Sequence, residues 1–165
     1  MSGTWSKRWA RRAAVGALVV VSGCGTDPTA PIPLTLRIAD AQRRWDRANL
    51  SHYRFYSSAG CECLPEYASR KEVFVLNDAV ISVQDAATGI PRPLAYRQPI
   101  DSLFALLRRE VWGEGTVEVE FDSRLGYPRR IAFGRREVDG GGIITVEELE
   151  ETEIAIAWQQ RQANP

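Results

Sequence analysis

The stretch Thr116-Val117-Glu118-Val119-Glu120-Phe121-Asp122 decides the fold class of this chain of 165 residues. Its apolar residues alternate with acidic ones, which is the period of a strand with one buried and one solvent-facing side. Arg124 to Pro128 then forms a turn, and Ile131 with Phe133 lies on a returning strand rich in arginine. The sequence therefore predicts an antiparallel pair with Glu opposite Arg on the solvent face, each such pair contributing about 0.2–1 kcal/mol.

Two further β-branched runs lie upstream. Val73–Leu76 and Val80–Val83 flank Asn77-Asp78-Ala79, which is typical of a β-hairpin with a tight turn. Before them, Tyr53-Arg54-Phe55-Tyr56 is short and aromatic-rich and indicates another strand.

The region from residue 143 to residue 158 can be read in two ways. Thr145 and Glu148 have the spacing of a helix capping box, whereas Ile143-Ile144-Thr145-Val146 is β-branched. It follows the flexible turn Asp139–Gly142, and a strand there would close the sheet. We favour a strand that begins at Ile143.

Two amphipathic helices complete the pattern. The first is predicted over Leu36–Leu50, with Trp45 as its main core anchor. The second is predicted to be capped by Asp101 and to end near Gly113. The fold class is therefore α+β, a small antiparallel sheet of about five to six strands packed against two helices. The predicted core aromatic residues are Tyr53, Phe55, Phe74, Phe104, Trp112, Phe121 and Phe133.

The N-terminal segment contains the residues that predict where the protein is located in the cell. Four bases and no acid precede the apolar run Ala13–Val21, which is too short to cross a bilayer that needs about 20 residues. This is the pattern of a signal peptide. Val21-Ser22-Gly23-Cys24 resembles a lipobox, in which the cysteine sulfur carries lipid. We expect an exported lipoprotein of the cell envelope, attached to the membrane surface through Cys24 and facing the periplasm or the exterior.

These signals divide the chain. Residues 1–23 are the signal peptide, 24–35 the lipidated N-terminus and proline-rich tether, 36–158 a single α+β domain and 159–165 a polar tail. Without residues 1–23 the 21 basic side chains fall by four while all 21 acidic ones remain, a formal charge of −4. An acidic chain does not suit nucleic acid as a partner.

Once Cys24 is lipidated, only Cys61 and Cys63 remain. An oxidising compartment favours a disulfide between them, but Cα atoms two residues apart in a strand are about 7 Å apart, so the bond requires a turn or bulge. A reduced pair that binds a soft metal, a redox-active pair and two free thiols are the alternatives. A closed zinc site needs about four ligands, and His52 is the one histidine of the chain. We therefore predict no metal site.

Two groups of acidic residues are candidates for chemistry. Glu118, Glu120 and Asp122 share a strand face and could act as paired carboxylates, although alternation alone explains them equally well. The acidic run Glu147–Glu153 is interpreted as a solvated face. The sequence contains neither the motif of a Ser-His-Asp catalytic triad nor that of a phosphate-binding loop. We predict no catalytic residue and no cofactor.

Several residues together resemble a family of uncharacterised bacterial lipoproteins catalogued as a domain of unknown function. The shared features, which cover most of residues 40 to 134, are Trp45, Tyr53, Cys61, Cys63, the valine hairpin, Ile100-Asp101-Ser102-Leu103-Phe104, Asp122 and Gly126-Tyr127-Pro128. The region after Arg135 follows the pattern less well. The resemblance implies export, lipidation and an α+β fold, and no catalytic residues.

The expected function is that of a lipid-anchored envelope protein that is not an enzyme. Its domain would bind a protein or another envelope component, or serve as a structural module. The alternative is a metal- or redox-linked accessory protein that acts through Cys61 and Cys63. A hydrolase ranks third.

Overall fold

Six strands form one antiparallel sheet in the order β3-β2-β1-β6-β5-β4. The structure is a computed structural model that describes residues 32–113, 115–134 and 141–152. The strands are β1 (His52–Gly60), β2 (Lys71–Leu76), β3 (Ala79–Asp85), β4 (Thr116–Phe121), β5 (Pro128–Gly134) and β6 (Gly142–Glu151). The predicted α+β fold with an antiparallel sheet is confirmed.

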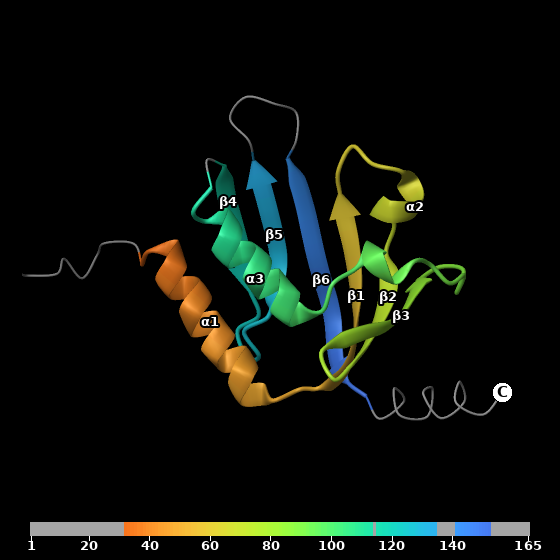
Figure 1. The fold of residues 1–165 in the computed structure, drawn as a ribbon, viewed down its shortest axis with the longest axis horizontal. Coiled ribbons are helices and arrows are strands. Elements are labelled where there is room, and N and C mark those ends of the chain that lie inside the picture. Colours follow the sequence, from red (N-terminus) through yellow and green to blue (C-terminus); the bar gives the residue numbers. More distant parts are fainter. Residues whose placement is uncertain (1–31, 114, 135–140, 153–165) are drawn as a thin grey trace, which may run out of the picture. The chain divides into compact units, whose positions relative to one another are not determined.

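Two long helices cover one face of this sheet, and no other described helix covers the opposite face, which is called the open face below (Figure 1). They are α1 (Leu34–Ala48) and α3 (Ile100–Glu110), and each turns one apolar side to the strands. A short helix, α2 (Pro65–Ala68), and a 3-10 turn, η1 (Leu94–Tyr96), were not predicted. Of the described helices, none is both long and apolar enough to span a bilayer.

The central strand β1 shows how alternation separates the two faces. Tyr53 and Phe55 are buried under the helices, whereas Arg54 and Tyr56 at the alternate positions point to the open side. Trp45 of α1 packs edge-on against Tyr53, with ring centroids 5.3 Å apart, so the predicted core anchor is confirmed. One strand thus supplies both the middle of the core and the middle of the open face.

The two hairpins follow their turn chemistry. Between β2 and β3, Asn77 and Asp78 both have positive φ, at 48° and 61°, as a two-residue turn of the primed type requires. Between β4 and β5, Gly126 has φ of 84° and lies against α1, where a Cβ would be 2.2 Å from the carbonyl oxygen of Ala41. That contact explains why glycine is needed before Tyr127.

Strand β6 begins at Gly142, which confirms the strand interpretation of residues 143–151. It contains a bulge where the register shifts between Arg54 and Tyr56 of β1, and Glu148 there has φ of 50°. The extra residue lets Val146 and Leu149, three positions apart, both point to the core.

Several local predictions were wrong. Trp112 is 83% exposed, because α3 ends at Glu110 and the side chain leaves the apolar face of the helix. Phe74 lies half-buried on the open face, since Val73 and Val75 take the inward positions of β2. Asp101 does not cap α3, which follows Pro99 without a side-chain cap; its carboxylate accepts a bond from Trp45 Nε1 instead, at 3.3 Å.

The remaining boundaries differ slightly. Helix α1 spans Leu34–Ala48 rather than Leu36–Leu50, so the last two residues assigned to the tether are helical. On the β4–β5 pair, Glu120 is opposite Arg130 as predicted, yet no ion pair joins these two strands among the described residues. The predicted signal peptide, most of the tether, and the tail lie outside the described residues.

Candidate functional site

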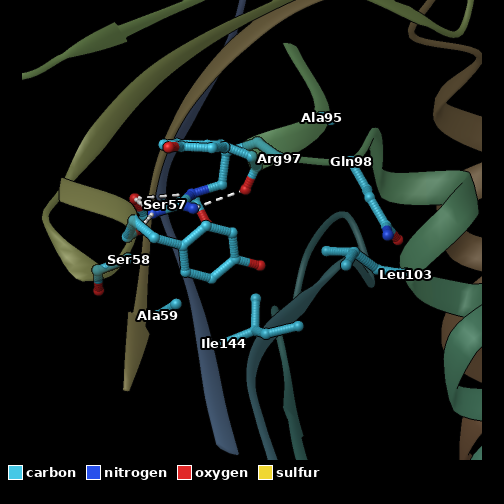
Figure 2. A pocket seen from close by; sticks show the side chains of 10 residues that line it. Ser57, Ser58, Ala59, Ala95, Arg97, Gln98, Leu103 and Ile144 are labelled. Atoms are coloured by element: carbon cyan, nitrogen blue, oxygen red, sulfur yellow. Dashed lines mark hydrogen bonds between the residues drawn. The ribbon is translucent and has the colours of Figure 1, made fainter. Parts of the chain in front are cut away.

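A small pocket lies where the connection between β3 and α3 crosses the end of the sheet. It has a volume of about 50 Å³. Its lining comes from β1, α2, the η1 segment, α3 and β6: Ser57, Ser58, Ala59, Tyr67, Ala95, Tyr96, Arg97, Gln98, Leu103 and Ile144. Figure 2 shows Arg97 on one side and Ala59 with Ile144 on the other. Segments far apart in the chain therefore meet here.

The buried guanidinium of Arg97 organises this pocket. Its nitrogens donate to the carbonyl oxygens of Ser57, Tyr67 and Ser69, at 3.0 to 3.4 Å, and to that of Tyr96. No carboxylate pairs with it among the described residues. Burial lowers the pKa of Arg97 from its ordinary value. Arg97 thus ties η1 and α2 to β1 and leaves a positive charge balanced by carbonyl dipoles alone.

A second buried cation lies next to Arg97. Lys71 is fully buried, and its ammonium donates to the Ser69 carbonyl, the Ser69 hydroxyl and Asp85, the last at 3.3 Å. The Ser69 hydroxyl, helped by Thr88 and Lys71 and opposed by burial, lowers the pKa of Asp85 to about 2. Because Ser69 contacts both Lys71 and Arg97, the two cations form one cluster with a single carboxylate.

The rim of the pocket offers the groups that a ligand would meet. The Tyr67 ring lies under Arg97, with 5.4 Å from guanidinium carbon to centroid, and edge-on to Tyr96. Within the described part of the chain, neither the Tyr67 hydroxyl nor the Gln98 amide has a hydrogen-bond partner. With Leu103 and Ile144 as the apolar side, the pocket suits a small group that has one polar end.

The cysteine pair follows directly after β1. Cys61 and Cys63 lie in a bend, their Cα atoms are 5.2 Å apart, and their sulfurs are at disulfide-bonding distance. The bend supplies the turn that an extended strand lacks. Cys61 is exposed and Cys63 half-buried. Cys24, the predicted lipidation site, lies outside the described residues.

The predicted acidic groups serve other roles. Glu118 and Glu120 are exposed on the edge strand β4, and Asp122 accepts from the backbone amides of Arg124 and Leu125 in the following turn. The structure therefore does not bring these three carboxylates together as a site.

In the acidic run of β6, Glu147 and Glu148 pair with Arg70, at 3.1 and 2.9 Å, and Glu150 pairs with Arg54 at 2.8 Å. His52 is the first residue of β1, opposite Leu76. No group of metal-binding side chains is present in the described ranges.

Sequence reasoning missed the Arg97 and Lys71 cluster. One signal was available for Lys71, which precedes Val73 and Val75 at the same period-two positions and therefore points inward with them. Arg97 gives no such signal, because it lies in a proline-flanked connection and its carbonyl partner Ser57 is 40 positions away.

Comparison with known proteins adds the family. The chain matches no curated protein and no solved structure. The profile of a family of unknown function (DUF6174) matches residues 37–151. This range runs from α1 to the end of β6 and so includes the region after Arg135, which follows the pattern of the resemblance less well. The chain belongs to this family of unknown function.

Proposed function

We propose that this protein is exported, attached to the membrane surface through lipid on Cys24, and acts in the cell envelope by binding rather than by catalysis. The observation that carries the proposal is the sequence Val21-Ser22-Gly23-Cys24 directly after a basic segment and the apolar run Ala13–Val21. Small residues before a cysteine at that place are what a lipoprotein signal peptidase requires.

The cysteine pair agrees with export. Cys61 is exposed and at disulfide-bonding distance from Cys63, and exposed disulfides persist in oxidising compartments. A cytosolic chain would keep these thiols reduced.

Lipid labelling of whole cells tests whether the protein is exported and lipidated at Cys24. The full chain is expected to incorporate a labelled fatty acid and to migrate as the mature form. Cys24→Ser should abolish the label and leave the unprocessed precursor. Cys61→Ser is the matched control, because it removes a cysteine without touching the signal, and it should label normally. Normal processing of Cys24→Ser to an unlabelled product would overturn the proposal.

The pocket beside Arg97 is the proposed binding site of the domain. The Tyr67 hydroxyl and the Gln98 amide lie at its rim without a hydrogen-bond partner among the described residues, and Arg97 holds together the segments that carry them. A photo-reactive side chain in place of Gln98 should give a discrete adduct in cells, and the same side chain in place of the exposed Ile90 should not. Tyr67→Phe should weaken the adduct at position 98. Equal labelling at both positions would contradict a site here.

A second candidate is a thiol–disulfide role for Cys61 and Cys63, which the exposure of Cys61 favours. Thiol titration of the denatured protein, with and without reductant, tests it. A structural pair should be fully oxidised when isolated from cells. A mixed population of thiols, or bound copper or zinc, would favour the redox or metal role.

A further inference from the structure

The most exposed large apolar side chain among the described residues is Trp112, at 83%. It follows the end of α3 and donates no hydrogen bond to any described residue. Tryptophan combines an apolar ring system with one polar N–H, and it is enriched at the boundary between lipid and water. A solvent-facing tryptophan of this kind needs an explanation that core packing does not give.

The end of α3 lies at the same corner as the start of α1. Trp45 near the end of α1 contacts Asp101 at the start of α3, and Gln42 accepts from Arg108 near the end of α3, so the two helices run in opposite directions. A groove of mixed character then connects the start of α1 with β4, the strand that follows Trp112. It is lined by Ile32, Leu34, Arg37, Val117, Glu118, Val119, Glu120 and Arg130. Figure 1 shows both helices on the same face of the sheet.

Two further exposed apolar side chains lie at the start of α1. Ile32 is 66% exposed and Leu36 is 59% exposed. We call Ile32, Leu36, Arg108, Arg109 and Trp112 the helix-end surface. It joins three exposed apolar side chains to two exposed arginines at the ends of two helices. Arg108 donates to the neutral Gln42, and Arg109 pairs with the adjacent Glu110 at 3.0 Å.

The charge of the two helices complements a negative surface. Helices α1 and α3 carry six arginines and four acids, whereas the six strands carry eight acids and four bases. The covering layer is therefore net positive and the sheet net negative. Anionic phospholipids attract basic groups that lie within a Debye length of about 8 Å.

The length of chain before α1 brings this surface to the bilayer. Only eight residue steps separate Cys24 from Ile32. Fully extended, they reach at most about 28 Å. The helix-end surface contains the residue at which this segment enters the domain, so it is the part of the domain that the segment keeps nearest to the lipid.

We infer that the helix-end surface is a second membrane contact, which inserts Trp112 into the interfacial layer of an anionic bilayer while Arg108 and Arg109 face the headgroup phosphates. The inference rests on the proposed lipid anchor for the nearness of the bilayer. The acidic open face of the sheet and the pocket beside Arg97 would then be directed away from the lipid or along it, accessible to partners.

Quenching by brominated lipid tests this contact. The lipidated full-length protein, purified from membranes, is placed in vesicles of phosphatidylglycerol and phosphatidylethanolamine whose acyl chains carry bromine near the headgroup. The difference between wild type and Trp112→Phe isolates the emission of Trp112. We expect that emission to be blue-shifted and to lose most of its intensity, and to recover when phosphatidylcholine replaces both lipids.

Controls separate this inference from lipid anchoring. Leu64→Ser removes an exposed apolar side chain outside the helix-end surface, 66% exposed, and should leave quenching unchanged. Protein that floats with the vesicles while Trp112 emission stays unquenched and red-shifted overturns the contact and leaves the anchor intact; a protein partner for Trp112 would then be the alternative. Quenching that is equal in phosphatidylcholine contradicts the role of anionic lipid. Protein that fails to float overturns the anchor and, with it, the inference.

Discussion

The two faces of the sheet are built from alternate residues of the same strands, yet they are stabilised by different interactions. On the covered face, Tyr53 and Phe55 pack under α1 and α3 and are almost completely buried. On the open face, Tyr56 lies beside Arg70, whose guanidinium carbon is 3.7 Å from the ring centroid, while Arg54 pairs with glutamates on both neighbouring strands. The covered face is stabilised mainly by burial of apolar area. The open face is stabilised mainly by interactions between charged groups that solvent and salt screen.

The same contrast holds for ion pairs. Lys71 and Asp85 meet on the covered face, where the lysine is fully buried, whereas Arg70 and Glu147 meet on the open face, where both side chains are substantially exposed. When a buried ion pair loses one partner, the remaining charge has neither a partner nor water around it, which destabilises the fold. When an exposed pair loses one partner, water solvates the remaining charge. The stability of the fold should therefore depend mainly on the side chains of the covered face. The side chains of the open face can change to suit a binding partner.

The largest expected effect comes from the core of β1. Phe55→Ala should lower the free energy of unfolding by about 3–5 kcal/mol, because it leaves a cavity under the helices. Tyr56→Ala, one position further along the strand, should cost only about 1 kcal/mol through its lost contacts with Arg70 and Arg54. Urea unfolding of both variants measures the difference, and equal losses would contradict the assignment of the two faces.

The next effect comes from the buried cation. Lys71→Met keeps the apolar stem but leaves Asp85 without its ammonium partner, and should cost about 3 kcal/mol. Arg54→Met removes an arginine from the open face and is the matched control, at about 1 kcal/mol or less. If Lys71→Met unfolds at the same urea concentration as wild type, the cluster around Ser69 does not stabilise the fold.

Local patterns were enough to predict most of the sheet. Strand β4 alternates cleanly, and Asn77-Asp78 supports the hairpin turn, so both were found from a few neighbouring residues. Strand β6 was ambiguous for a physical reason. Its bulge puts Val146 and Leu149 three positions apart, which is also the spacing of a helix face.

The wrong predictions fall where the hydrophobic periodicity of an element ends, or where the contacting residues are far apart in the sequence. Trp112 lies one position beyond Val111, the residue that continues the helical spacing of Leu107, and the helix stops before both; sequence locates helix ends poorly. Phe74 lies in a run of four apolar residues, which has no period to assign a face. The pocket depends on Arg97 reaching carbonyls on two other segments, β1 and the α2 region, and no local pattern encodes such contacts.

Lowering the pH should reduce the contribution that the Asp85 carboxylate, on the covered face, makes to the stability of the fold. The pKa of Asp85 is lowered from 3.8 to about 2, so its stabilising contribution is complete above the unfolded value and is lost as pH falls through the folded one. Asp85→Asn should therefore be less stable than wild type near neutral pH, and the gap should narrow between about pH 4 and pH 2. Thermal unfolding across that range measures it. A gap that stays constant would mean that the ionised form is not favoured by Ser69, Thr88 and Lys71.

The smallest expected effect belongs to the open face. Arg70→Ala removes the pairs with Glu147 and Glu148 and the contact with Tyr56, and should cost about 0.5–1 kcal/mol. Because these charges are exposed, the loss should shrink in about 1 M salt, where the Debye length falls to roughly 3 Å. Arg109→Ala is the control, since its described ion pair is with the adjacent Glu110, and it should leave stability unchanged. A loss above about 2 kcal/mol that persists in salt would mean that the open face is a second structural layer, and the contrast between the two faces would not hold.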